Sequence, residues 1–186
     1  YEWREFDHDP EVYKNIYHTG KIAGVYQLDT HTMRPFVARL QPKSIMDIAN
    51  ICAVVRPGTL DATAPDPSMT DISAAEYYIR VITGEVNPFY FHEELRPILE
   101  ETGSVLLFQE QTLKFARDLV GYTYETAEVF RRAMGKKDPV LLEKELKPVG
   151  EALAKRGWSD LQITQMKETI KASARDIIPA GAIPPK

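Results

Sequence analysis

Helix start and stop signals recur along this chain and divide it into short segments. Residues that cap helix N-termini stand before apolar-periodic stretches, as in Asp9-Pro10-Glu11 and at Ser44, which is followed three residues later by Asp47. The spacing of Ser73 with Glu76 and of Ser159 with Gln162 predicts a capping box at each of these helix starts. Glycine or proline follows most of these stretches, where a helix would end. This punctuation predicts a mainly α-helical protein built from several separate helices.

The apolar spacing places these helices and leaves little room for strands. The expected helices lie within residues 9–20, 30–40, 44–55, 73–84, 93–101, 105–120, 123–134 and 138–157, with a last one from Ser159 onward. The core face of this last helix is expected to contain Ile163, Met166 and Ile170. Residues 22–28 are short, β-branched and aromatic, and they predict a strand or a buried extended segment. Residues 59–70, with Pro65 and Pro67, predict a surface loop. We expect an irregular multi-helix domain over residues 1–175, with at most one or two short strands, and a Pro-rich tail over residues 176–186.

Composition excludes several classes of protein. With 44% hydrophobic and 27% charged residues, the 186-residue chain has the composition of a globular protein. No apolar run is long enough to span a membrane, and the polar start does not resemble a signal peptide, so we expect a cytoplasmic protein without membrane contacts. The net charge of −4 gives no general attraction for polyanions, so any contact with nucleic acid needs a local basic cluster.

Cysteine and histidine usage gives no sign of a metal centre. The single cysteine, Cys52, lies in an apolar run and is predicted to be a small core residue in a reducing compartment. The four histidines are scattered, and no pair has the spacing of metal ligands on one helix face. We therefore expect no metal site.

The most distinctive feature is a basic cluster around a glycine. Residues 131–137 read Arg-Arg-Ala-Met-Gly-Lys-Lys, which places Arg131, Arg132, Lys136 and Lys137 around Gly135. The glycine lets the backbone turn sharply, so the four cations can converge on one anion. Alternatively, cations at a helix C-terminus simply complement the helix dipole and remain solvated.

Two other polar features are candidates for a binding site. Arg56 ends an apolar helix just before a break, where it can point into a cleft or lie along the surface. Gln109, Glu110 and Gln111 stand together in an amphipathic segment and are either site residues or ordinary polar positions. No nucleophile and base, Gly-rich phosphate loop or pair of carboxylates for two-metal chemistry is visible, so no catalytic residue is predicted.

Several segments, in the same order and at similar spacing, resemble the fingers region of the bacterial C-family replicative polymerases, the DNA polymerase III alpha subunits. The resemblance extends from about Asp9 to Ala174. The segments that carry it are residues 24–29 with Met33, 40–42 with Asp47-Ile48, Arg56-Pro57-Gly58, 95–102, 109–111, Gly121-Tyr122 and 131–137. The last of these is the most specific.

The resemblance implies how the candidate residues act. In such polymerases the fingers close over the incoming dNTP and bring cations to its triphosphate, while the palm holds the carboxylates that bind Mg²⁺. The implied phosphate contacts are Arg131, Arg132, Lys136 and Lys137, with Arg56 as a second candidate. Gln109, Glu110, Gln111 and Gly135 would support the pocket. Implied partners are dNTP, primer-template DNA, and the palm domain or other replisome proteins.

The departures from the family pattern define the alternatives. The palm aspartates are absent, so the chain alone is expected not to polymerise DNA and to carry no cofactor, with Mg²⁺ expected in the complete polymerase. Val81-Ile82 replaces a common Arg-Lys pair, and Asp176-Ile177 stands where a Gly-Phe-Asn-Lys-Ser-His stretch would follow. The alternative function is therefore a non-catalytic interaction module derived from the fingers, acting as a decoy, inhibitor or scaffold. An independent enzyme is the least favoured hypothesis.

Overall fold

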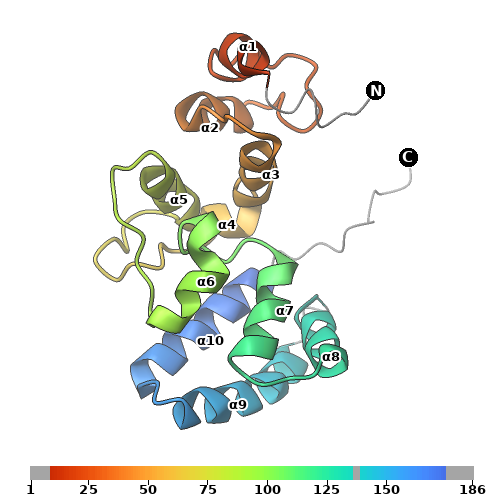
Figure 1. The fold of residues 1–186 in the computed structure, drawn as a ribbon, viewed down its shortest axis with the longest axis vertical. Helices are drawn as coiled ribbons and strands as arrows, with labels where there is room; N and C mark the ends of the chain where they lie inside the picture. The colour runs from red at the N-terminus through yellow and green to blue at the C-terminus, as the bar shows by residue number, and fades with distance from the viewer. Residues whose placement is uncertain (1–8, 136–138, 175–186) are drawn as a thin grey trace. The chain divides into compact units, whose positions relative to one another are not determined.

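The described residues fold into helices that form two compact units. The computed structural model describes residues 9–135 and 139–174 (Figure 1). Within these ranges every regular element is helical, and the only strand-like pairing is an isolated bridge between Thr63 and Ser73. The prediction of a mainly α fold is confirmed. The predicted tail, residues 176–186, lies outside the described residues, and the boundaries of the domain and its tail stay a prediction.

Among the described residues, the first unit comprises residues 9–64 and 71–87. Its helical elements are α1 (Pro10–Val12), η2 (Tyr13–Tyr17), α2 (Met33–Leu40), α3 (Ile45–Val54), α4 (Pro57–Asp61) and α5 (Ala74–Ile82). The predicted capping box of α3 is confirmed. The Ser44 hydroxyl accepts the Asp47 N–H, and the Asp47 carboxylate accepts the Ser44 N–H at 3.0 Å.

An ion pair and an apolar core hold α2, α3 and α5 together. The Arg39 guanidinium donates to both carboxylate oxygens of Glu76, at 2.8 and 3.0 Å, which links α2 to α5. The capping box predicted for α5 is only half formed. Ser73 accepts the Glu76 N–H, but the Glu76 carboxylate binds Arg39 and Arg80 instead of returning to the cap. One apolar cluster of this unit contains Ile22, Leu28, Met33, Val37 and Ile51.

Among the described residues, the second unit comprises residues 65–70, 88–135 and 139–174. Its helical elements are η3 (Glu93–Leu95), α6 (Arg96–Leu99), η4 (Glu100–Thr102), α7 (Gln109–Asp118), α8 (Tyr124–Gly135), α9 (Pro139–Lys155) and α10 (Asp160–Ala174). Helix α8 contacts α7, α9 and α10. The predicted capping box of α10 is confirmed by hydrogen bonds in both directions between Ser159 and Gln162. Ile163, Met166 and Ile170 are buried, as predicted.

Three local predictions were wrong, and each failure has a backbone cause. Residues 22–28 form turns rather than a strand, because Gln27 has a φ of +63° and reverses the chain. Helix α7 begins at Gln109 rather than at residue 105. Ser104 has a left-handed backbone, with a φ of +67°, which ends the preceding helical turn, and the chain then runs in a non-helical segment up to residue 108. Residues 59–61, predicted as part of a surface loop, belong to the short helix α4, because Pro57 suits the first helical position.

Candidate phosphate-binding site at the end of helix α8

The core packing of α8 determines where its arginines emerge. Ala127, Phe130 and Met134 lie on one face of the helix and are buried in the core of the second unit. Arg131 and Arg132 follow Phe130 in the last turns of the helix, beside this buried face. The apolar spacing therefore fixes both arginines at the C-terminal end of α8, although neither belongs to the core.

Arg131 is held by two neighbours. Its Nε and Nη2 donate to the two carboxylate oxygens of Glu128, at 2.8 and 2.6 Å, one turn earlier on α8. Its Nη1 donates to Oε1 of Gln109, at 2.5 Å, in the first turn of α7. The Glu128 carboxylate raises the pKa of Arg131, and Arg131 in turn lowers the pKa of Glu128. Arg131 is thus fixed in position and connects α8 to α7.

Arg132 is far more exposed than Arg131. Its side chain is 66% exposed, against 25% for Arg131, and its Nε lies 3.4 Å from the same Glu128 oxygen that accepts from Arg131. One carboxylate therefore faces two guanidinium groups, which leaves one positive charge in excess among the three side chains. Sequence reasoning missed Glu128, although its position three and four residues before the arginines is the usual spacing of helical ion pairs. Lys136 and Lys137 lie outside the described residues, directly after Gly135.

The three polar residues at the start of α7 have different environments. Gln109 contacts Arg131, as described above, and Glu110 is exposed, with its charge acting on Arg131. Gln111 is buried and uses its amide within the fold. Its oxygen accepts the N–H groups of residues 107 and 108, and its nitrogen donates to the Ile98 carbonyl and the Thr102 hydroxyl. Of the three, Gln109 alone has a hydrogen bond to the arginines within the described ranges.

Arg56 lies in the first unit, whereas Arg131 and Arg132 lie in the second. It precedes α4, is exposed, and donates from Nε to the Cys52 carbonyl at 3.1 Å, near the end of α3. Cys52 itself is partly buried against the core, and burial raises the pKa of its thiol. The convergence of Arg56 and Arg131 on one nucleotide stays a prediction.

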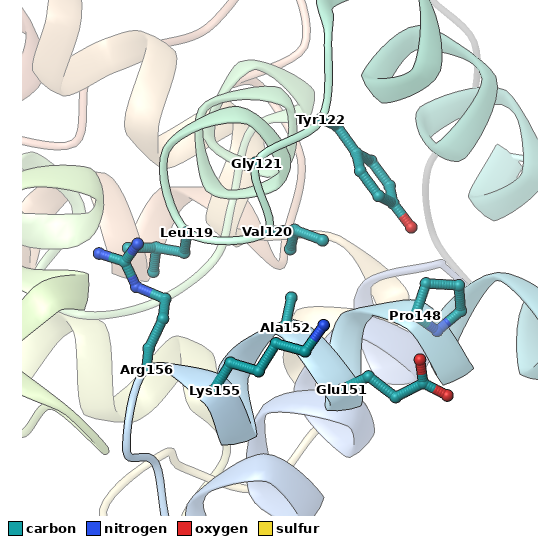
Figure 2. Close-up of a pocket in the computed structure, with 9 residues that line it drawn as sticks. All are labelled: Leu119, Val120, Gly121, Tyr122, Pro148, Glu151, Ala152, Lys155 and Arg156. Atoms are coloured by element: carbon teal, nitrogen blue, oxygen red, sulfur yellow. The ribbon is translucent and has the colours of Figure 1, made fainter.

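A concavity of about 410 Å³ opens elsewhere in the second unit, between the segment after α7 and the second half of α9 (Figure 2). The residues that line it are Leu119, Val120, Gly121, Tyr122, Pro148, Glu151, Ala152, Lys155 and Arg156. The Tyr122 ring packs edge-on against Phe130, with 6.1 Å between ring centroids. The lining charges have both signs, on Glu151, Lys155 and Arg156, and Arg156 is already paired with Glu94, so the lining shows no clear preference for an anion. None of the predicted site residues that the structure describes lines this concavity.

The described residues offer neither a metal cluster nor a helix suited to a bilayer. Across residues 9–135 and 139–174, no three His, Cys, Asp or Glu side chains gather in a group that could hold a metal ion. In the same ranges, no helix combines the length and apolar character needed to cross a membrane. The basic end of α8, defined by Arg131 and Arg132 in its last turns, is a candidate phosphate-binding site because of the positive charge of these side chains.

Comparison with known proteins decides the family. The profile of the bacterial DNA polymerase III alpha subunit finger domain matches residues 3–157. The chain belongs to this family. The predicted resemblance to the fingers of the alpha subunit is therefore confirmed. The match covers the described part of the first unit and the second unit through α9, and α10 lies beyond it.

Individual relatives agree with the family profile. The DNA polymerase III alpha subunit of Aquifex aeolicus is 32% identical over 166 residues, which cover 89% of this chain and 13% of that protein. The alpha subunit of Haemophilus influenzae is 34% identical over 149 residues, covering 80% of this chain and 12% of the relative. The alpha subunit of Pasteurella multocida is 36% identical over 119 residues, which cover 64% of this chain and 10% of that relative. The matched region thus spans only 10–13% of the length of these relatives.

Proposed function

We propose that this finger domain binds the phosphates of an incoming dNTP and of primer-template DNA through the basic end of α8. Arg132 is the direct phosphate contact, with Lys136 and Lys137 adding charge, and Arg56 is a second contact. The observation that carries the proposal is that Glu128 faces both arginines. This carboxylate fixes Arg131 through two short hydrogen bonds and leaves Arg132 two-thirds exposed.

In this arrangement Arg131 is a positioning residue. Its three guanidinium nitrogens all donate to Glu128 or Gln109, so it orders the last turns of α8 instead of reaching for a ligand. Arg132 keeps a guanidinium fork that suits phosphate oxygens. Fixed cations stabilise the negative charge that spreads over the phosphoryl oxygens during transfer, and this requires no proton acceptor from the domain.

The catalytic step belongs to other parts of the complete polymerase in this proposal. Polymerases use Mg²⁺ held by carboxylates, and the described residues contain no cluster of that kind. The domain therefore supplies nucleotide and DNA contacts, is inactive alone, and works beside the palm or other replication proteins in the cytoplasm. We assign no step of the reaction to Mg²⁺ at the residues described here.

Replacing Arg132 with alanine is expected to weaken binding of a dNTP and of primer-template DNA about tenfold, because one phosphate contact is lost. The slope of log affinity against log salt for DNA should fall by about 1. Fluorescence anisotropy titrations at several salt concentrations measure both quantities. Unfolding should be almost unchanged, since Arg132 is mostly exposed.

Arg117→Ala is the matched control for Arg132→Ala. Arg117 is also exposed near the end of a helix, α7, and its loss changes the net charge equally. Its effect on affinity should stay within about twofold, because only the long-range charge changes. Equal weakening by both variants would show that general charge, not the α8 site, binds the ligand, and would contradict the proposal.

A further inference from the structure

The loop of residues 22–29 lies in the segment between η2 and α2 (Figure 1). It carries one strongly exposed aromatic side chain. Tyr26 is 81% exposed. Ile22 and Leu28, near the two ends of the loop, are fully buried in the apolar cluster of the first unit. The loop is therefore anchored at both ends while Tyr26 remains in solvent. An exposed tyrosine on an anchored loop is a candidate for contact with a ligand.

Hydrogen bonds inside the loop fix its backbone. The Val25 carbonyl accepts the N–H groups of Leu28 and Asp29, each at 3.1 Å. The Asp29 carboxylate accepts the Gly24 N–H at 2.8 Å and also binds the Arg34 guanidinium, which lowers the pKa of Asp29. Backbone and side chain together therefore close the loop on itself.

The residue after Tyr26 has a strained backbone. Gln27 has a φ of +63°, a left-handed conformation that costs a non-glycine residue about 1 kcal/mol or more. Gly24 has a φ of +80°, but glycine adopts this conformation readily. Such strain persists where the surroundings enforce it, as the anchors and hydrogen bonds do here. The chain thus keeps a conformation that exposes Tyr26, although extended backbone would be less strained.

We propose that Tyr26 is a stacking platform for an unpaired nucleobase of single-stranded nucleic acid. A tyrosine ring stacks on any base, because every base presents a flat π-face. The loop fixes the backbone at Tyr26 before binding, so little backbone conformational entropy is lost on stacking. Lys21, directly before the loop, is exposed and can serve a neighbouring phosphate. The choice of nucleic acid rests on the proposed function.

The small size of the exposed apolar surface favours a base over a protein partner. Specific protein interfaces bury about 800 Å² on each partner, with a continuous apolar centre. In this loop Ile22 and Leu28 are buried and Val25 is partly buried against the same apolar cluster, while the exposed neighbour of Tyr26 is the polar Gln27. A single ring beside a polar amide suits one flat base.

The test measures binding of a single-stranded oligonucleotide that contains 2-aminopurine, whose fluorescence is quenched on stacking. We expect the 186-residue chain to quench this probe. Tyr26→Phe should keep the affinity within about twofold, whereas Tyr26→Ala and Tyr26→Leu should each weaken it about tenfold and remove most of the quenching. Leucine retains apolar area but loses the flat ring, so affinity retained by Tyr26→Leu would overturn the stacking proposal, because the strand would then bind without a stacked ring.

An abasic oligonucleotide completes a double-mutant cycle. The wild-type chain should lose about tenfold in affinity when the probe base is removed, and Tyr26→Ala should lose little more, because both changes remove the same contact. Additive losses would overturn the stacking contact, as would a wild-type chain that binds neither oligonucleotide. Leu161→Ala, at an exposed apolar position on α10, should change nothing.

Positioning by the loop is tested separately. Asp29→Asn removes the charge that pairs with Arg34 and so loosens the loop, but it does not change Tyr26 itself. Binding should weaken several-fold, and the preference for a normal over an abasic strand should be smaller than in wild type. Unchanged affinity in this variant would show that the loop does not preorganise the ring. If Tyr26→Ala has no effect while Arg132→Ala weakens binding, this inference fails and the proposed function stands. The reverse result would reject the α8 site and keep the stacking platform.

Discussion

Replacing Gln111 with alanine is expected to lower the free energy of unfolding by about 2–3 kcal/mol. The buried Gln111 amide makes four hydrogen bonds, to two backbone N–H groups before α7, to the Ile98 carbonyl and to the Thr102 hydroxyl. Alanine leaves these groups without their partner, and those that stay away from water bear the full desolvation cost. Urea denaturation followed by circular dichroism measures the change.

Two further variants separate the network from other effects. Glu110→Ala changes the neighbouring exposed residue in the same first turn of α7, so unfolding should change by no more than about 0.5 kcal/mol. Gln111→Glu keeps an acceptor for the two N–H groups but loses both N–H donors, so it should still destabilise the protein. Stability equal to wild type in Gln111→Ala would mean that water replaces the amide and that the network contributes nothing.

Helix ends were predictable from sequence where the partners are close along the chain. Ser44 with Asp47 and Ser159 with Gln162 form the capping boxes that their three-residue spacing predicts. Glu76 has the same spacing after Ser73, but Arg39, 37 residues away, takes its carboxylate. Local spacing cannot reveal a distant competitor of this kind.

In the candidate site, too, contacts between residues close along the chain were predictable, and contacts between distant residues were not. The cluster of Arg131 and Arg132 is evident in the sequence, and its link to Glu128 follows from helical spacing. The contact between Arg131 and Gln109 joins two helices whose contacting residues are 22 positions apart in the sequence, and no periodic pattern predicts it. The structural role of Gln111 is equally hidden, because its partners lie 9 and 13 residues away in an irregular segment.

The Ile22 to Leu28 segment shows why its strand prediction failed. Its β-branched and aromatic composition describes which side chains pack, and Ile22 and Leu28 are indeed buried. Composition does not encode the left-handed turn at Gln27, a residue type that rarely adopts a positive φ. The turn arises because both ends of the loop are drawn into the same core.

Acidification is expected to destabilise this protein through Glu94. The Glu94 carboxylate accepts from Arg156, and from the Trp158 indole N–H at 2.9 Å, with His92 Nδ1 at 3.5 Å. These partners, Arg156 first, lower the pKa of Glu94 from its ordinary 4.5 to about 2. Stability from this group is therefore complete above pH 4.5 and is lost as the pH falls toward 2. About a third of the side chain is exposed, so solvent screening reduces the contribution to about 1–2 kcal/mol.

Unfolding titrations between pH 6 and 2.5 test this contribution. Glu94→Gln should be less stable than wild type at pH 6, and the difference should shrink as the pH falls, because the amide does not titrate. Trp158→Phe removes the indole N–H but keeps an aromatic ring beside His92, which stacks on Trp158 with 4.5 Å between centroids, so it should lose part of the same pH dependence. Glu93→Gln is the control, since its ion pair with Arg96 is largely exposed and contributes little. In this account the cluster joins η3 to the turn between α9 and α10 only while Glu94 is ionised. A pH dependence that is identical in wild type and Glu94→Gln would therefore show that the partners of this carboxylate do not stabilise the fold.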